Sequence, residues 1–209
     1  MKTEIQNAEA VRKRYNRIAP FYDFMESLVE RSRYSRWREL LWSQVEGNNI
    51  LEVGAGRGKN FPYYPANTEI IAIDFSEKML SRARKKARDF GTRAQLIPMD
   101  VQDMEFEDNT FDTVVGSFIF CSVPDPIKGL QEVKRVCKPE GKVLLLEHVL
   151  SANQALAGLM NLANPVVVKL MGPNINRRTV ENVASSGLKV EKVTELAFGI
   201  FKLIGARKE

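Results

Sequence analysis

Ile50-Leu51-Glu52-Val53-Gly54-Ala55-Gly56-Arg57-Gly58 decides the fold, because a short apolar run leads directly into three glycines at alternate positions. A second apolar run, residues 70–73, follows and ends in the carboxylate of Asp74. Glycine lets the backbone approach a ligand closely and adopt positive φ. In dinucleotide-type folds, an acidic residue about 20 positions after the glycine loop binds the ribose hydroxyls. The pattern therefore predicts a cofactor that contains a nucleoside.

The spacing of the glycines distinguishes between classes of cofactor. Dinucleotide-binding proteins use G-x-G-x-x-G and place a pyrophosphate at a helix N-terminus. Here the spacing is G-x-G-x-G, and Glu52 precedes it. A carboxylate beside the loop would repel a pyrophosphate but suits a cofactor that carries an ammonium group. A nicotinamide oxidoreductase is therefore the weaker alternative.

The composition indicates one ordinary domain. The chain has 209 residues, 44% of them hydrophobic, which is enough for a sizeable core. Cys121 and Cys137 lie in apolar or helical contexts and indicate reduced thiols of a cytosolic protein. With one histidine, His148, and no C-x-x-C, we expect no metal site. Residues 1–10 lack the apolar core of a signal peptide, and no apolar run reaches the roughly 18 residues of a transmembrane helix.

The charge of +5 and the pI of about 9.2 suggest either a solvated basic surface or an anionic partner. Aromatic residues do not interleave with the basic ones as in an RNA-recognition module, so we expect no nucleic-acid partner. An anionic membrane surface fits better. The expected location is cytoplasmic, with the possibility of peripheral attachment to the inner face of a membrane. The sequence does not determine the oligomeric state.

Residues 1–46 are expected to form an N-terminal helical segment with a break near Ala19-Pro20. Basic clusters at 12–17 and 31–38 flank an aromatic and apolar stretch. Such a segment could bind a membrane surface, or act as a lid that packs its apolar side on the domain, and the two roles are compatible.

From residue 49 the pattern alternates between strand and helix, which predicts an α/β fold over residues 47–209. We expect a doubly wound, mostly parallel, seven-stranded sheet. The expected strands are 50–53, 70–73, 94–98, 111–118, 142–148 and a closing hairpin of 188–196 and 198–206. Helices are expected from the Ser76 cap to Phe90 and over 126–138. Residues 152–171 are apolar but too interrupted to span a bilayer, and could be a pocket cover, an interfacial segment or a packed helix.

Motifs at 52–58, 74–80, 100–101, 111–112 and 130–142 occur in a characteristic order. This ordered set strongly resembles the class I S-adenosylmethionine-dependent methyltransferases, in the branch that includes ubiquinone/menaquinone-type enzymes. The resemblance covers roughly residues 12–150. It implies the Rossmann-like fold, the cofactor S-adenosylmethionine and the product S-adenosylhomocysteine.

The resemblance also implies a set of cofactor-binding residues. They are Tyr22, Glu52, Gly54, Gly56, Gly58, Asp74, Phe75, Met79, Asp100, Val101 and Ser117. The glycines would line the methionine part, Glu52 would face its positive side, and Asp74 would accept from both ribose hydroxyls. Phe75 and Met79 would sandwich the adenine, although both could instead be core residues.

Two further roles follow from the resemblance. Asp100, with the Val101 backbone, would read the adenine edge, although the carboxylate could instead only cap a turn. Ser117 would approach the sulfonium.

Shorter segments narrow the resemblance. Residues 15–23 look like the lid of quinone and phospholipid methyltransferases, which folds over the bound cofactor. Segments 121–126 and 146–149 are similar to bacterial phosphatidylethanolamine N-methyltransferases, and with 58–65 also to membrane-bound thiol S-methyltransferases of animals. They imply N-methylation of a phospholipid amine at a membrane surface. Quinone C-methylation, small-thiol S-methylation and a cofactor-binding protein without chemistry are the alternatives.

Candidate catalytic residues must position an acceptor and take up its proton. His148 follows the fifth strand at the ligand-binding rim, and its ordinary pKa of ~6.5 suits a base, although a structural role is equally open. Tyr15 and Tyr22 could orient an amine or stack on its methylated cation. Arg177 and Arg178 could clamp a lipid phosphate or simply form a solvated helix start.

Overall fold

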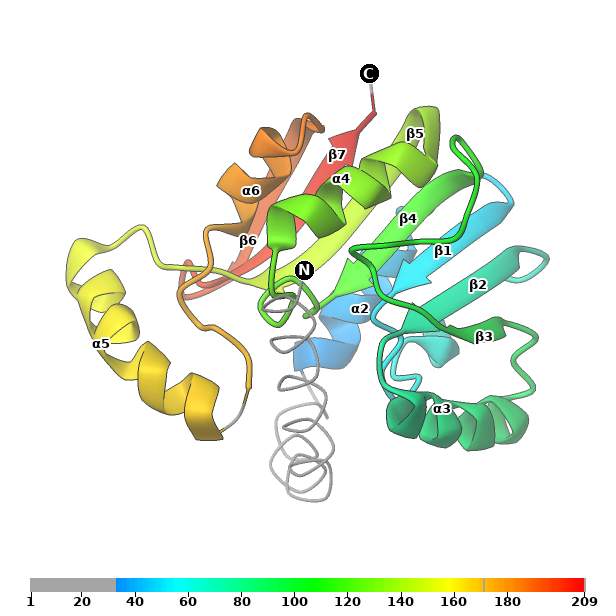
Figure 1. Ribbon diagram of the computed structural model, residues 1–209, viewed down its shortest axis with the longest axis horizontal. Helices are drawn as coiled ribbons and strands as arrows, with labels where there is room; N and C mark the ends of the chain where they lie inside the picture. Colours follow the sequence, from blue (N-terminus) through cyan, green and yellow to red (C-terminus); the bar gives the residue numbers. More distant parts are fainter. Residues whose placement is uncertain (1–32, 171, 209) are drawn as a thin grey trace.

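The computed structural model describes residues 33–170 and 172–208 and contains a seven-stranded sheet in the order β3-β2-β1-β4-β5-β7-β6 (Figure 1). The strands are β1 (Asn49–Val53), β2 (Glu69–Asp74), β3 (Gln95–Pro98), β4 (Phe111–Ser117), β5 (Cys137–His148), β6 (Lys189–Ala197) and β7 (Phe201–Arg207). Pairs among β1 to β5 are parallel, and β7 is antiparallel to β5 and β6. The predicted doubly wound, mostly parallel sheet is confirmed.

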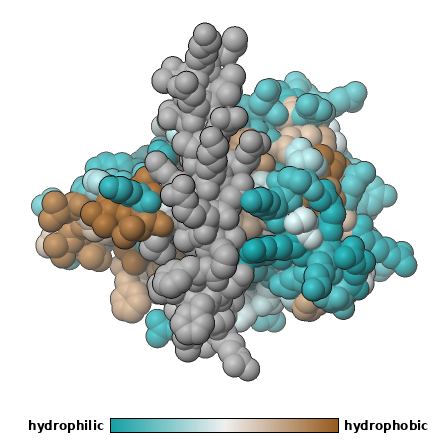
Figure 2. Space-filling model, turned by 60° about the horizontal axis from the view of Figure 1, so that its bottom comes forward, coloured by the Kyte–Doolittle hydropathy of each residue, from teal (hydrophilic) through white to brown (hydrophobic). Residues whose placement is uncertain are grey.

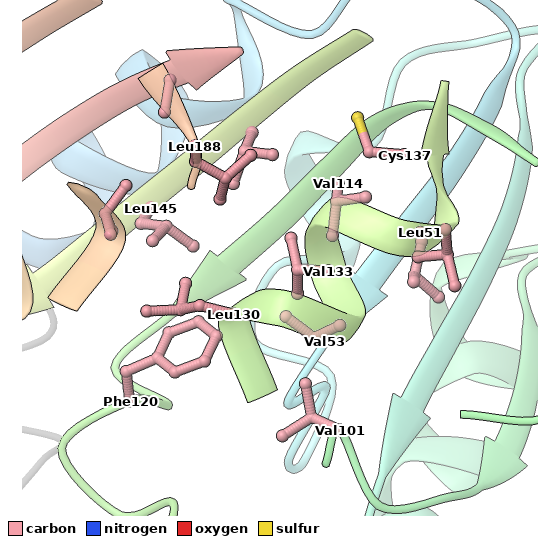
Figure 3. Close-up of a cluster of buried hydrophobic side chains, with 14 of the residues drawn as sticks. Leu51, Val53, Val101, Val114, Phe120, Leu130, Val133, Cys137, Leu145 and Leu188 are labelled. Atoms are coloured by element: carbon pink, nitrogen blue, oxygen red, sulfur yellow. The ribbon is translucent and has the colours of Figure 1, made fainter. Parts of the chain in front are cut away.

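Helices cover both faces of the sheet. The helices α4 (Pro126–Val136) and α6 (Thr179–Ser185) lie on one face. Leu130 and Val133 of α4 meet inward-facing residues of the central strands (Figure 3), and Val183 of α6 belongs to the same buried cluster. On the other face lie α2 (Ser35–Trp42), the short 3-10 helix η2 (Phe61–Tyr63) and α3 (Glu77–Phe90). Central strands buried on both faces explain the near-continuous apolar run of β4.

Local signals at α3 work as predicted. The Ser76 hydroxyl accepts the N–H of Met79 at the helix start, and Gly91 ends the helix with φ +65°. By contrast, α4 stops at Val136 rather than at residue 138, and β5 begins at Cys137 rather than at 142. The residue before a proline disfavours the helical conformation, and Pro139 therefore shortens the helix.

The closing hairpin is present, but its second strand begins at Phe201 rather than at residue 198. Residues 198–200 form the turn, in which Phe198 and Gly199 have positive φ. Residues with positive φ are typical of tight hairpin turns, and they shift the strand start.

Only part of the predicted N-terminal segment can be assessed, because residues 1–32, including the lid around Tyr15 and Tyr22, lie outside the described residues. Within the described part, α2 packs on the sheet through Trp37, Leu41 and Trp42. Arg38 differs from what its place in the basic cluster 31–38 suggests for a membrane-binding surface. Its side chain is buried, because the buried face of α2 includes this position.

The apolar stretch 152–171 contains the helix α5 (Gln154–Leu170), which projects from one side of the sheet (Figure 1). Met160 is its one buried residue, so the alternative of a packed helix is wrong. Across residues 33–170 and 172–208, none of the helices combines the length and the apolar character that crossing a membrane requires.

Candidate active site

A cavity of about 570 Å³ opens at the carboxyl ends of the parallel strands. It lies where β1 and β4 are neighbours, which is the point at which the strand order reverses. Open α/β sheets bind ligands at this switch point, because the loops after the two central strands diverge to opposite faces. The volume is typical of a site for a small molecule or cofactor.

The glycine loop forms one wall of the cavity. Gly54 and Gly56 line it, with φ of +76° and +55°. At Gly56 an added Cβ would meet nothing closer than the Gly54 carbonyl oxygen at 4.0 Å, so the loop leaves free space there for a ligand. Gly58 does not line the cavity, contrary to prediction. A Cβ there would lie 2.2 Å from the Phe61 ring, so Gly58 makes room for a buried aromatic residue.

Asp74, at the end of β2, is oriented by the backbone on both sides. Its Oδ2 accepts the N–H of Gly56 and its Oδ1 accepts the N–H of Ser76, each at 2.8 Å. Burial raises the pKa of this carboxyl, and the two backbone donors oppose the shift. Each carboxylate oxygen retains acceptor capacity, and the side chain lines the cavity. The arrangement fits a pair of ribose hydroxyls.

An apolar slot adjoins Asp74. Phe75 and Met79 both line the cavity, and Phe75 is 37% exposed. The structure therefore contradicts the alternative that Phe75 is a core residue. Val101 and Asp100 line the same end. The Asp100 carboxylate does cap a turn, because it accepts the N–H of Gln102 at 2.9 Å, yet it also borders the cavity, so both interpretations of Asp100 hold.

Glu52 was expected to face the cofactor, but it does not line the cavity. It is fully buried, and its two oxygens accept from the Asn60 amide and the Tyr64 hydroxyl. Burial raises its pKa, and the hydrogen bonds and the positive charge of Arg38 oppose that rise. The reason for the misplaced prediction is geometric: successive strand residues point to opposite faces, so Glu52 points into the face that α2 and η2 cover.

The residues that do face the cavity at this place are Arg38, Asn60 and Ser117. Arg38 Nη1 donates to Asn60 Oδ1 at 2.7 Å and to Ser117 Oγ at 2.8 Å. Asn60 Nδ2 donates to Ser117 Oγ at 2.9 Å. A buried cation therefore borders the cavity next to the glycine loop, where it could bind a carboxylate.

Sequence reasoning missed Arg38 and Asn60. Asn60 lies two residues after the last loop glycine, a position close enough to the motif to have been considered. Arg38 carried no local signal, because it resembles its basic neighbours in α2.

The opposite half of the cavity is aromatic. Tyr34, Phe118, Phe201 and His148 line it, at the ends of α2, β4, β7 and β5. His148 packs edge-on against Phe201, with ring centroids 5.1 Å apart. Burial lowers the pKa of His148, and its Nδ1 is buried with no hydrogen-bond partner among the described residues. The imidazole is therefore neutral near pH 7.

Glu147 holds the loop that follows β4 through two hydrogen bonds. Its Oε1 accepts the N–H groups of Ile119 (3.0 Å) and Phe120 (3.1 Å), directly after the end of β4. The side chain is fully buried, and burial raises its pKa to about 7. Cys121 lies in the same loop, where burial raises the pKa of the thiol to about 12. The thiol is thus protonated near neutral pH, as expected for a packed cysteine.

Two predicted substrate residues lie apart from the cavity walls. Arg177 donates to the Val123 carbonyl at 2.9 Å and is half-buried, whereas Arg178 is exposed just before α6. Neither is among the described residues that line the cavity. Within the described ranges, no three His, Cys, Asp or Glu side chains gather as a metal site would require.

The side chains present fit S-adenosylmethionine. Paired acceptor oxygens at Asp74, an apolar slot at Phe75 and Met79, free space at Gly56 and a cation at Arg38 match its ribose, adenine, methionine chain and carboxylate respectively. All of these groups border one cavity of sufficient size.

Known proteins with similar sequences support this fit. A family model described as a methyltransferase domain matches residues 51–145. The chain is 38% identical over 142 residues to the phosphatidylethanolamine N-methyltransferase of Cereibacter sphaeroides. The aligned region covers 67% of this chain and 68% of that protein. It is 34% identical over 137 residues to the demethylmenaquinone methyltransferase of Renibacterium salmoninarum, covering 64% of this chain but 56% of that enzyme.

A similar solved structure is a methyltransferase of Thermotoga maritima, described as a possible histamine N-methyltransferase. It has a TM-score of 0.71 at 18% identity and covers 94% of this chain and 99% of that one. At this identity the likeness concerns the fold.

Proposed function

This chain belongs to the S-adenosylmethionine-dependent methyltransferases, and from that premise we propose that it methylates the amine of a phosphatidylethanolamine-type headgroup at a membrane surface. The observation that carries the proposal is the 38% identity to a phosphatidylethanolamine N-methyltransferase, which extends over about two thirds of both proteins. The cavity supports it, because its second half offers aromatic rings and a neutral imidazole rather than acidic groups.

In this proposal the chain holds the cofactor through Asp74, Asp100 and the glycine loop, with Arg38 on the carboxylate. S-adenosylmethionine supplies a methyl group that is already activated by the sulfonium. The protein then needs mainly to bring the acceptor into line with that methyl group, because the cofactor carries the difficult chemistry. Ser117 and its partner Asn60 lie between the two halves of the cavity and would fix the donor end.

His148 would take up the proton of the acceptor amine. An amine must be neutral to act as a nucleophile, so a proton has to leave it before or during transfer. Burial keeps the pKa of His148 below its ordinary 6.5, so its basic form predominates near neutral pH. The side chain lines the acceptor half of the cavity.

The exposed face of α5 would place the protein on the membrane. Leu159, Leu162, Val166 and Leu170 are spaced by three or four residues and therefore share one face of the helix. The helix α5 forms a hydrophobic area at the left of Figure 2, and Leu162 is 78% exposed. An exposed apolar patch of this kind marks an interaction surface.

A lipid surface is the occupant that the surroundings favour. On the same helix Val167, the neighbour of Val166 in the chain, lines the cavity that would receive a lipid headgroup. The charge of +5 suits anionic lipid, and Lys169 is the one charged residue within α5.

Quinone C-methylation is the second candidate, favoured by the 34% identity to a demethylmenaquinone methyltransferase. A quinone ring could stack on the aromatic half of the cavity. Both candidates are lipids, so membrane binding does not distinguish them, whereas the identity of the labelled product does.

The test is an assay of the full chain with methyl-labelled cofactor and vesicles that contain phosphatidylethanolamine, anionic lipid and a demethylated quinone. Mass spectrometry should find the label in methylated phosphatidylethanolamine. Label in the quinone alone would favour the second candidate, and the absence of any labelled lipid would contradict both. Asp74→Ala, run in parallel, gives the background.

A further inference from the structure

The acceptor half of the cavity contains three aromatic rings that touch one another. Centroids lie 5.3 Å apart for Tyr34 and Phe118, 5.7 Å for Tyr34 and Phe201, and 6.3 Å for Phe118 and Phe201. All three line the cavity. We call this continuous surface of Tyr34, Phe118 and Phe201 the aromatic wall.

The core holds the wall in place from behind. Its three residues pack against the buried cluster that contains Trp37, whose ring lies 5.1 Å from that of Phe201. Each of the three is only half-buried, because the opposite side faces the cavity. The rings are thus positioned before a ligand arrives, which lowers the entropy cost of binding.

The strand order separates the wall from the residues that are expected to bind the ribose and the adenine. Asp74, Phe75 and Asp100 follow β2 and β3, on one side of the junction between β1 and β4. Phe118 follows β4, and Phe201 begins β7, on the other side. The wall therefore lines the part of the cavity that the proposed acceptor would occupy.

We propose that the aromatic wall is a binding site for methylated ammonium groups, so that partly methylated headgroups bind better than the primary amine. Aromatic faces attract cations that lie within about 6 Å of the ring centroid, and quaternary ammonium ligands are recognised by clusters of such rings. The inference rests on the proposed function, whose acceptor is an amine.

A cation already occupies one side of the wall. The guanidinium carbon of Arg38 lies 5.4 Å from the Phe118 centroid. Its charge would repel a second cation, but it also donates to Asn60, and it opposes the rise that burial causes in the pKa of Glu52. The ammonium would therefore bind toward Phe201 rather than over Phe118, the ring that Arg38 already contacts.

The consequence is successive methylation of one acceptor. In each round the lone pair of a neutral amine forms the new N–C bond while the C–S bond breaks and its electron pair stays on sulfur. The product of the first two rounds loses a proton before the next, and the third leaves a quaternary ammonium. Because affinity for the wall rises with methylation, intermediates stay bound to the enzyme rather than accumulate.

The direct test compares choline with the neutral alcohol in which carbon replaces its nitrogen. The full chain, saturated with S-adenosylhomocysteine, is titrated with each, and binding is followed by NMR relaxation of the ligand methyl groups. Choline should bind about tenfold more tightly, because shape is equal and only the charge differs. Equal affinity would overturn the proposal, since a wall that acts only by apolar contact does not distinguish the two.

Variants locate the site. Phe201→Leu should weaken choline binding about fivefold while the affinity for S-adenosylhomocysteine stays within about twofold. Phe198→Leu is the matched control, because that ring belongs to the same hairpin but is 76% exposed and does not line the cavity. Tyr34→Phe retains a ring and should retain binding. An unchanged choline affinity in Phe201→Leu would refute the assignment, and the wild-type comparison stands even if this variant folds poorly.

The failure of this inference can be told from failure of the proposed function. Lipid methylation with equal binding of the two probes would reject the wall and leave the function intact. Selective choline binding without lipid methylation would support the wall and point to another amine acceptor. With lipid substrates, the dimethylated headgroup should show a lower KM than the unmethylated one, and a higher KM would contradict the proposal.

Discussion

The carboxylate of Asp74 accepts the backbone N–H of Gly56 at 2.8 Å and so joins the end of β2 to the glycine loop after β1. The two groups that are expected to hold opposite parts of the cofactor are therefore parts of one hydrogen-bonded unit. A change at either residue should affect cofactor affinity more than it affects the fold, because both border the cavity rather than the core.

Asp74→Ala should raise the dissociation constant of S-adenosylmethionine at least about tenfold, because it removes charge-assisted acceptors for hydroxyl groups. Isothermal titration calorimetry measures this directly. Asp89→Ala, at an exposed position of α3, is the control and should bind normally. Unchanged affinity in Asp74→Ala would argue against the ribose contact.

Gly56→Ala should mainly lower cofactor affinity, whereas Gly58→Ala should mainly lower the free energy of unfolding. At Gly56 the added methyl meets open space, so the fold should lose only about 1 kcal/mol to the left-handed backbone, while cofactor affinity falls because the methyl enters the cavity. At Gly58 the methyl overlaps the Phe61 ring, so the free energy of unfolding should fall by at least about 2 kcal/mol. Chemical unfolding and calorimetry separate the two effects, and identical behaviour of the two variants would contradict this division.

Glu147→Gln should remove a pH dependence of stability. The folded-state pKa of Glu147 is about 7 and lies above the unfolded value near 4.5. The protonated carboxyl therefore contributes its full stability below pH 4.5, and this stability is lost as the pH rises through about 7. Relative to wild type, Glu147→Gln should gain up to about 3 kcal/mol between about pH 5 and pH 8. Urea unfolding at several pH values tests this. The exposed Glu105→Gln should follow wild type, and a Glu147→Gln curve parallel to wild type would count against the shift.

His148→Gln should lower kcat about a hundredfold, the lower end of what a general base contributes, with little change in cofactor affinity. In wild type the rate should fall on the acidic side at a pH below 6.5, because burial lowers the pKa of the imidazole and only its neutral form accepts a proton. The variant should lack this acidic limb. A variant that keeps both the rate and the limb would assign His148 a structural role instead.

Leu162→Gln combined with Val166→Gln should reduce sedimentation with anionic vesicles, because it removes apolar area from the exposed face of α5. Activity on a dispersed short-chain lipid should stay within about twofold, since neither residue lines the cavity. Phe90→Gln removes a ring of α3 that is 54% exposed and is the control. If the double variant instead changes the oligomeric state and not vesicle binding, the face belongs to a contact between copies.

Local sequence patterns could predict the order and the boundaries of the secondary-structure elements. The alternation of strands and helices, the Ser76 and Gly91 boundaries of α3 and the positions of Gly56 and Asp74 all depend on neighbours in sequence. Periodicity, capping and backbone freedom act over a few residues, so they can be read without knowing the packing. The ordered motifs then imply the cofactor, because those at 52–58, 74–80 and 100–101 follow the carboxyl ends of β1, β2 and β3 at one edge of the sheet.

Tertiary packing decided which side chains meet in the cavity. The Glu52 carboxylate is buried and accepts hydrogen bonds from Asn60 and Tyr64. Arg38 donates to Ser117, which is 79 positions away in the chain. The aromatic wall likewise unites Tyr34, Phe118 and Phe201 from three distant elements. Contacts between distant segments leave no local periodicity, because they depend on how the helices α2 and α3 and the hairpin settle on the sheet. The sequence by itself thus determined the fold and the cofactor class. The tertiary structure decided which side chains line the half of the cavity proposed for the acceptor.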